Sequence, residues 1–141
     1  MSTSPDQHAT APVEVPLPHG ELAPAEARRA ARDVLLRWRL PGLVDVVVLA
    51  VSELVTNAVR YGRPALTLEL QYSDSELRVA VHDGDPAEPP RATGATAPDG
   101  AESGRGLGIV HSLAADVGCE QVPDDGKVVY ASFVVDRDAG G

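Results

Sequence analysis

The sequence predicts an α+β two-layer sandwich, in which a mixed, mostly antiparallel sheet is covered on one face by about three helices. Alternating apolar and polar residues, typical of strands, occur on both sides of two long helical stretches, and short turns join neighbouring strands into antiparallel hairpins. Aromatic residues make up only 4% of the 141 residues, so the single core must consist mainly of valine, leucine and alanine. We expect one domain between two flexible tails, with the domain at residues 13–136 and the tails at 1–12 and 137–141.

The first strand and the first helix are both marked by proline. Residues 13–17 alternate in strand fashion, and Pro16 confines this strand to a sheet edge because proline cannot donate a ladder hydrogen bond. Pro24 suits the first turn of a helix, and the helical pattern continues from there to Pro41. We expect Trp38, near the end of this pattern, to pack the helix onto the sheet.

A second helix is expected from residue 43 to residue 61, followed by Gly62 as a left-handed cap. Its many valines lower the intrinsic helix propensity, so tertiary packing must hold the segment helical. A buried strand is the alternative for residues 45–51. The pattern continues without a break to residue 61, and this continuity favours the helix.

The second half of the chain follows the order strand, strand, loop, helix, strand, strand. The first two of these strands form a hairpin, and a turn at residues 124–126 joins the last two. The loop at residues 86–103 breaks every periodicity, which is typical of a functional lid or of disorder. The expected strands span residues 65–72, 77–82, 116–122 and 127–135, and the expected helix spans residues 105–115.

The net charge of −9 argues against direct nucleic-acid binding, because such a field repels phosphate backbones. The single cysteine, Cys119, cannot form an internal disulfide, which suits a reducing compartment, and we expect it to be a small core residue. The N-terminus has neither a basic start nor an apolar stretch, and we expect that no later run approaches membrane-spanning length. We therefore expect a cytoplasmic protein with neither a nucleic-acid nor a membrane partner.

Two polar residues of the second helix are candidates for chemistry. At about 100° per residue, its apolar side chains fall on one face, and Glu53 and Asn57 fall together on the opposite face, flanked by Val46 and Ala50. A carboxylate and a carboxamide one turn apart can share a Mg²⁺ ion and its waters, with Asn57 as a ligand and Glu53 orienting a water or hydroxyl. Taken alone, such a pair is more typical of an ordinary solvated face.

Two further motifs follow. Asp83-Gly84 ends a strand, where the carboxylate can accept a hydrogen bond from an exocyclic amine such as adenine N6, although Asp-Gly is also a common turn. Gly104–Gly108 opens a helix, where free N–H groups and the helix dipole suit phosphate, and Arg105 could add a charge-assisted contact. A flexible hinge is the alternative for these glycines. No Gly-Lys-Ser/Thr follows them, which excludes a Walker A loop, and their spacing does not match the dinucleotide-binding fingerprint.

In order and spacing, the three motifs resemble those of the GHKL ATPase superfamily, which has the Bergerat ATP-binding fold. The resemblance is greatest to its small bacterial anti-sigma-factor-type serine/threonine kinases and ATP-binding regulators, and it covers roughly residues 13–135. The matching segments are Glu53–Ala58 for the N box, Asp83-Gly84 for the start of the G1 box and Gly104–Gly108 for the G2 box. After Gly84 the further glycines of the usual G1 box are missing.

The resemblance implies ATP and Mg²⁺ as cofactors, with Asn57 as the Mg²⁺ ligand and Asp83 as the residue that reads adenine. It implies residues 86–103 as the lid over the phosphates and, in kinase members, Glu53 as the general base. The residues that it places around the nucleotide are Asn57, Asp83, Gly84, Gly104, Arg105, Gly106, Leu107 and Gly108.

The resemblance also implies a sigma factor and/or an anti-anti-sigma protein of the STAS type as partner, and it leaves a homodimer open. Arg28, Arg29 and Arg32 of the first helix could form the partner-binding face, and an ordinary solvated face is equally consistent. Two functions stay open: a protein serine/threonine kinase that acts on an anti-anti-sigma partner, or a nucleotide-dependent protein-binding module without phosphoryl transfer. A member that no longer binds nucleotide is a third possibility.

Overall fold

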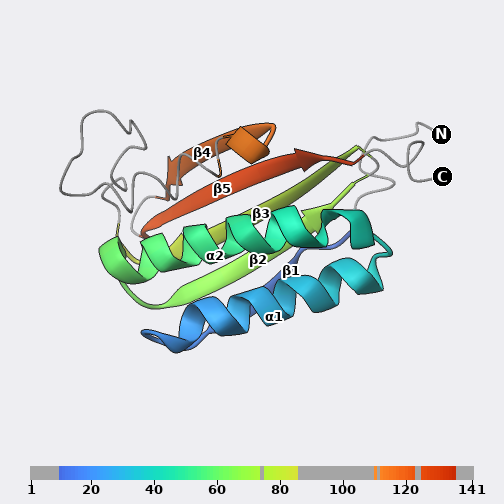
Figure 1. Cartoon of the computed structure of the whole chain (residues 1–141). Coiled ribbons are helices and arrows are strands. Elements are labelled where there is room, and N and C mark those ends of the chain that lie inside the picture. Colours follow the sequence, from blue (N-terminus) through green and yellow to red (C-terminus); the bar gives the residue numbers. More distant parts are fainter. Residues whose placement is uncertain (1–9, 74, 86–109, 111, 123–124, 136–141) are drawn as a thin grey trace.

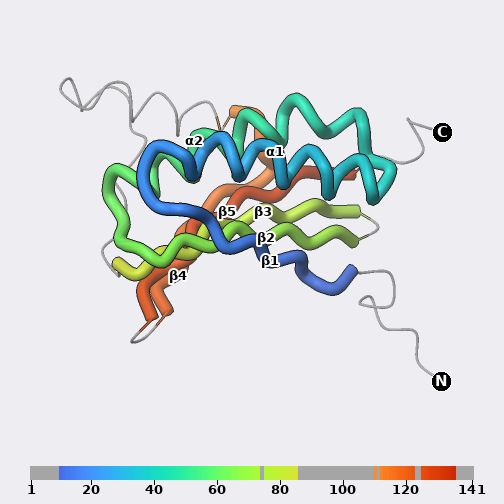
Figure 2. Tube along the Cα trace, turned by 90° about the horizontal axis from the view of Figure 1, so that it is seen from below, coloured from blue at the N-terminus to red at the C-terminus, as the bar shows by residue number. Residues whose placement is uncertain are grey.

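A computed structural model describes residues 10–73, 75–85, 110, 112–122 and 125–135. Two long helices lie side by side on one face of a five-stranded sheet, which confirms the predicted α+β two-layer sandwich (Figures 1 and 2). Val110, Ser112 and Leu113 are also helical. The elements in chain order are β1 Val13–Leu17, α1 Leu22–Arg37, the short 3-10 helix η2 Pro41–Leu43, α2 Val44–Tyr61, β2 Leu66–Tyr72, β3 Glu76–Asp83, β4 Asp116–Gln121 and β5 Lys127–Val134.

The strand order across the sheet is β1-β2-β3-β5-β4. All four pairings between these described strands are antiparallel, so the expected mixture with parallel pairs is not found among them. The physical reason is the final hairpin: β4 forms the far edge, and β5 turns back between β4 and β3, antiparallel to both. β1 forms the other edge, as Pro16 predicted.

The helix α2 is the central helix of the core. Its β-branched valines are held helical by burial, because seven of its residues are shielded from solvent against α1 and the sheet. These residues are Val47, Ala50, Val51, Leu54, Val55, Asn57 and Ala58. The prediction of a helix rather than a strand over residues 45–51 is confirmed.

The first helix packs closely against α2 and the sheet through small side chains. Ala23, Ala27 and Ala31, spaced four apart, are each fully buried, and this spacing lines one helix face. At its end, the Trp38 ring lies 5.8 Å from the Tyr72 ring, centroid to centroid. Because Tyr72 belongs to β2, the expected packing of Trp38 onto the sheet is confirmed.

The segment Pro41–Tyr61 is long and apolar enough to span a membrane, by length and composition alone. The sequence prediction that no segment reaches this length was therefore wrong. A core helix of a globular domain meets the same criteria, and α2 packs its buried face on the sheet and on α1. The buried part of this apolar segment, 39% of it, belongs to the core.

Substitution of Leu68 tests this core. Leu68 is fully buried at the middle of β2, opposite Val15 on one neighbouring strand and Val81 on the other. We expect Leu68→Ala to lower the free energy of unfolding by about 2–5 kcal/mol, because the change removes buried apolar contacts and leaves a cavity. Urea unfolding followed by Trp38 fluorescence measures this loss.

The matched control is Leu36→Ala on α1, where the leucine is 51% exposed. Its free energy of unfolding should stay within about 0.5 kcal/mol of the unsubstituted protein. Equal losses in the two variants would contradict the placement of the core between α2 and the sheet.

Candidate functional site

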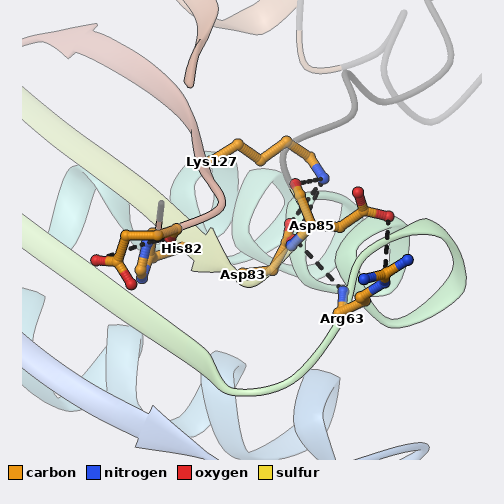
Figure 3. A network of polar contacts seen from close by, with 6 residues as sticks. Arg63, His82, Asp83, Asp85 and Lys127 are labelled. Atoms are coloured by element: carbon orange, nitrogen blue, oxygen red, sulfur yellow. Dashed lines mark hydrogen bonds and ion pairs between the residues drawn. The ribbon is translucent and has the colours of Figure 1, made fainter. Parts of the chain in front are cut away.

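The strongest candidate site is a buried ion pair between the end of β3 and the start of β5. Asp83 and Lys127 face each other in the register of these two strands. Their exposed fractions are 1% and 2%, and the Lys127 Nζ lies 3.1 Å from Oδ2 and 3.2 Å from Oδ1 of Asp83 (Figure 3). Charged side chains are almost never buried to this degree unless they are paired. The pair therefore marks a place where the chain holds charge inside the protein.

The two oxygens of Asp83 have different partners. Oδ1 accepts hydrogen bonds from the backbone N–H of Asp85 at 2.7 Å, from that of Arg63 at 3.3 Å and from Lys127. Oδ2 accepts no hydrogen bond from the described residues, although the Lys127 ammonium is within ion-pair distance. Buried acceptors in proteins usually have an aligned donor, so Oδ2 is an atom to which a ligand can donate a hydrogen bond.

Gly62 makes room for this carboxylate. A Cβ on Gly62 would lie 2.6 Å from Cγ and 2.7 Å from Oδ2 of Asp83, closer than such atoms approach in proteins. The backbone of Gly62 has φ −99° and ψ −167°, so the predicted left-handed cap was wrong. Glycine stands here because Asp83 approaches the helix end, and its N–H still bonds the Ala58 carbonyl at 2.8 Å.

Gly126 is the second glycine that the site requires. It precedes Lys127, has φ +89°, and a Cβ on it would overlap the carbonyl oxygen of Asp83. Only glycine adopts this backbone conformation at no cost while another backbone passes so close. The turn before β5 is thereby drawn against the end of β3, which brings Lys127 to Asp83.

A recess opens beside the pair, and we call it the Asp83 recess. Its walls come from the C-terminal half of α2 and from the ends of β3 and β5. The lining residues are Leu54, Asn57, Ala58, Tyr61, Gly62, Asp83, Lys127 and Val129. One wall is apolar and the other carries the charged pair, so the recess combines apolar contact with polar groups that can orient a ligand.

Asn57 lies in this recess and is only 6% exposed, so the prediction that it faces away from the core was wrong. At about 100° per residue, Asn57 is only about 20° from Ala50 around the helix. Ala50 is itself fully buried, which places Asn57 at the margin of the core face. The Asn57 side chain has no hydrogen-bond partner among the described residues, so its amide is available to a ligand.

Glu53 lies one turn before Asn57 on α2 and is half-buried. It does not line the Asp83 recess, so the structure brings together Asn57 and Asp83 but not Glu53. Gly84 directly follows Asp83, and its N–H bonds the Arg63 carbonyl at 2.7 Å, which fixes the turn after β3. The predicted phosphate segment Gly104–Gly108, with Arg105 and Leu107, lies outside the described residues, as do the lid residues 86–103.

Lys127 is the site residue that the sequence analysis missed. A signal was present, because Lys127 is the only lysine in the chain and follows a glycine at a strand start. Its partner could not be read from the sequence, since 44 residues separate it from Asp83. Sheet register alone places the two charges together.

The described residues contain no group of three or more His, Cys, Asp or Glu side chains that could hold a metal ion. A divalent cation would therefore need ligands from a bound molecule as well as from the protein. His82 lies apart from the Asp83 recess, and its ring nitrogen contacts the Asp125 carbonyl oxygen at 2.7 Å (Figure 3). This contact between β3 and the turn before β5 agrees with a structural role for His82.

Comparison with known proteins gives one finding. The model of a family described as histidine kinase-like ATPase domain matches residues 21–133, which include α1, α2, β2, β3, β4 and all but the last residue of β5, whereas β1 precedes the match. No similar protein was found among curated proteins.

The close approach of Gly62 to Asp83 can be tested by Gly62→Ala. We expect a loss of about 1–3 kcal/mol in the free energy of unfolding, because the added methyl group must displace the carboxylate or the helix end. Urea unfolding followed by Trp38 fluorescence measures it. The control is Gly42→Ala, where a Cβ meets no atom within 4 Å. If both variants kept the original stability, the close packing around Asp83 would be refuted.

Proposed function

The chain belongs to the histidine kinase-like ATPase domain family, and we propose that it is an anti-sigma-type regulator that binds ATP and phosphorylates a serine of an anti-anti-sigma protein. The family assignment supports an ATP-binding regulatory function. Serine specificity and the identity of the partner are our proposal. They extend the resemblance of the motifs around Glu53, Asp83 and Gly104.

The observation that best supports nucleotide binding is that Asp83 Oδ2 is ion-paired with Lys127 but accepts no hydrogen bond from the described residues. Oδ2 is buried at the recess and lacks a hydrogen-bond donor among the described residues. The 6-amino group of adenine supplies such a donor, whereas guanine places a carbonyl oxygen at the same ring position. Leu54 and Val129 offer apolar walls for the ring. The recess therefore favours adenine nucleotides over guanine nucleotides.

Asn57 is the residue we propose as the magnesium ligand. Its amide oxygen is a hard donor, it has no partner among the described residues, and it lines the same recess as Asp83. Mg²⁺, when bound with the nucleotide, would neutralise phosphate charge during transfer. Gly104–Gly108 and Arg105, which lie outside the described residues, are proposed to hold the phosphates through backbone N–H groups and the guanidinium group.

Phosphoryl transfer needs a base for the attacking hydroxyl. We assign this role to Glu53, which is half-buried one turn from Asn57 on the same helix. Its carboxylate would take the proton of the partner's serine as the serine oxygen bonds to the γ-phosphorus and ADP leaves. The second candidate, a nucleotide-dependent binding module without transfer, is favoured by the position of Glu53 outside the Asp83 recess.

The partner surface is proposed on the helical layer next to Glu53. The Arg28 guanidinium donates a hydrogen bond to Ser52 Oγ at 3.1 Å, so a basic side chain of α1 reaches the residue before Glu53. Arg29 and Arg32 are exposed on the same helix. Arg29 also pairs with Glu26 at 3.6 Å, and we propose that the three arginines orient an acidic partner toward Glu53. We propose a cytoplasmic location, and a homodimer stays open.

Nucleotide binding is tested first by Asp83→Asn. The asparagine keeps the shape of the side chain but loses the charge that accepts the amine hydrogen bond. We expect Mg-ATP affinity, measured by isothermal titration calorimetry, to fall by about tenfold or more. The matched control, Asp116→Asn at the exposed start of β4, should bind as the unsubstituted protein does. A circular dichroism melt of each variant confirms that it is folded, and unchanged affinity in folded Asp83→Asn would argue against adenine recognition by this residue.

Glu53→Gln separates the two candidate functions. In the kinase, this change removes the base but leaves the Asp83 recess intact, so ATP affinity should stay within about twofold. Transfer of ³²P from γ-labelled ATP to an anti-anti-sigma protein should fall by about 10²–10⁴-fold, the usual contribution of general base catalysis. Asp45→Asn, an exposed change on the same helix, is the control. Absence of transfer by the unsubstituted protein, with ATP bound and the partner captured, would favour the binding module.

A further inference from the structure

The Lys127 ammonium is placed to contact a ligand in the Asp83 recess as well as to neutralise Asp83. An ammonium group has three N–H donors. Two of them are used, one on Asp83 Oδ1 at 3.2 Å and one on the Asp85 carbonyl oxygen at 2.9 Å. The Lys127 Nζ also lies 3.1 Å from Asp83 Oδ2 without forming an aligned hydrogen bond, so one donor is left for a ligand.

A donor group and an acceptor atom thus lie 3.1 Å apart on two residues that line one recess. Asp83 Oδ2 offers the acceptor and Lys127 Nζ offers the donor, and both residues line the recess. A complementary ligand edge presents an N–H donor beside a ring acceptor. The 6-amino group of adenine is flanked by N1 on one side and by N7 on the other, and both nitrogens are acceptors.

We propose that Lys127 is a specificity-determining residue, whose ammonium donates a hydrogen bond to the adenine ring nitrogen beside the 6-amino group. The inference rests on the proposed nucleotide site and extends it by one direct contact. Lys127 and Asp83 would then recognise the base through two hydrogen bonds. The Asp83 carboxylate accepts one from the 6-amino group, and the Lys127 ammonium donates the other to the ring nitrogen. Guanine and hypoxanthine both carry a carbonyl oxygen in place of the 6-amino group, so they offer Asp83 an acceptor instead of a donor.

Burial supports a contact of this kind. Lys127 is 2% exposed, so water cannot readily take its spare donor, and a charged group in such a place gains more from a partner than an exposed one. Gly126 and the strand register hold the lysine at this place, as described above. The ammonium is therefore positioned before the ligand arrives, which lowers the entropic cost of the contact.

The decisive experiment removes the ring acceptors one at a time. Affinities of the unsubstituted protein for ATP, 1-deaza-ATP, 7-deaza-ATP and 3-deaza-ATP are measured by isothermal titration calorimetry with Mg²⁺. We expect either the 1-deaza or the 7-deaza analogue to bind about tenfold or more weakly than ATP, and this analogue identifies the nitrogen that is read. The 3-deaza analogue, altered on the far side of the ring, is the control and should bind as ATP does.

Lys127→Met then assigns the contact to this residue. The methionine keeps most of the side-chain length and removes the donor. ATP affinity should fall, and the difference between ATP and the weakened analogue should disappear. If the difference persists in Lys127→Met, another group reads the ring, and the inference is wrong. The inference also fails if ATP and all three analogues bind the unsubstituted protein equally well.

A spectroscopic measurement avoids the risk that Lys127→Met does not fold. Because Lys127 is the only lysine, protein labelled with ¹⁵N-lysine gives a single side-chain ammonium signal. Saturating Mg-ATP should shift this signal, and the weakened analogue should shift it less. An unchanged signal with ATP bound would overturn the inference alone, whereas absence of any ATP binding would overturn the proposed function with it.

Discussion

The buried carboxylate of Asp83 joins three parts of the chain that are distant in sequence. It accepts hydrogen bonds from Arg63, which follows α2, from its neighbour Asp85, and from Lys127 at the start of β5. Placing a charge inside the protein is costly unless every neighbour is arranged to compensate it. The end of α2, the end of β3 and the turn before β5 must therefore adopt compatible conformations, and the glycines at positions 62 and 126 make this approach possible.

The same arrangement links the core to the site. α2 buries one face against the sheet and α1, and the margin of that face carries Asn57 into the Asp83 recess. The recess is thus built on a helix and two strands, and two of its polar groups, Asp83 Oδ2 and the Asn57 amide, lack a hydrogen-bond partner among the described residues. A ligand that donates a hydrogen bond to Asp83 Oδ2 binds only the folded state and stabilises it through mass action. Nucleotide binding and fold stability are therefore thermodynamically coupled in this protein.

Periodicity was enough to predict most of the fold. Strand alternation predicted β2, β3 and β5, and Pro16 predicted that β1 lies at an edge of the sheet. The unbroken apolar pattern predicted that α2 is a helix. Contacts between residues distant in sequence could not be predicted from periodicity. The burial of Asn57 depends on where the sheet meets α2, the conformation of Gly62 depends on Asp83, and the role of Lys127 depends on a register between strands 44 residues apart. Asn57 and Asp83 could be proposed from the sequence because each lies in a short contiguous motif, whereas Lys127 belongs to no such motif.

The burial of the only lysine has a consequence for the chemistry of the molecular surface. Every other basic side chain that is always charged is an arginine, so the folded chain presents no side-chain amine to solvent beyond the 2% exposure of Lys127. An amine-specific acylating reagent can modify this side chain only when the ends of β3 and β5 separate from α2. The rate of acylation at Lys127 therefore reports how often the recess opens.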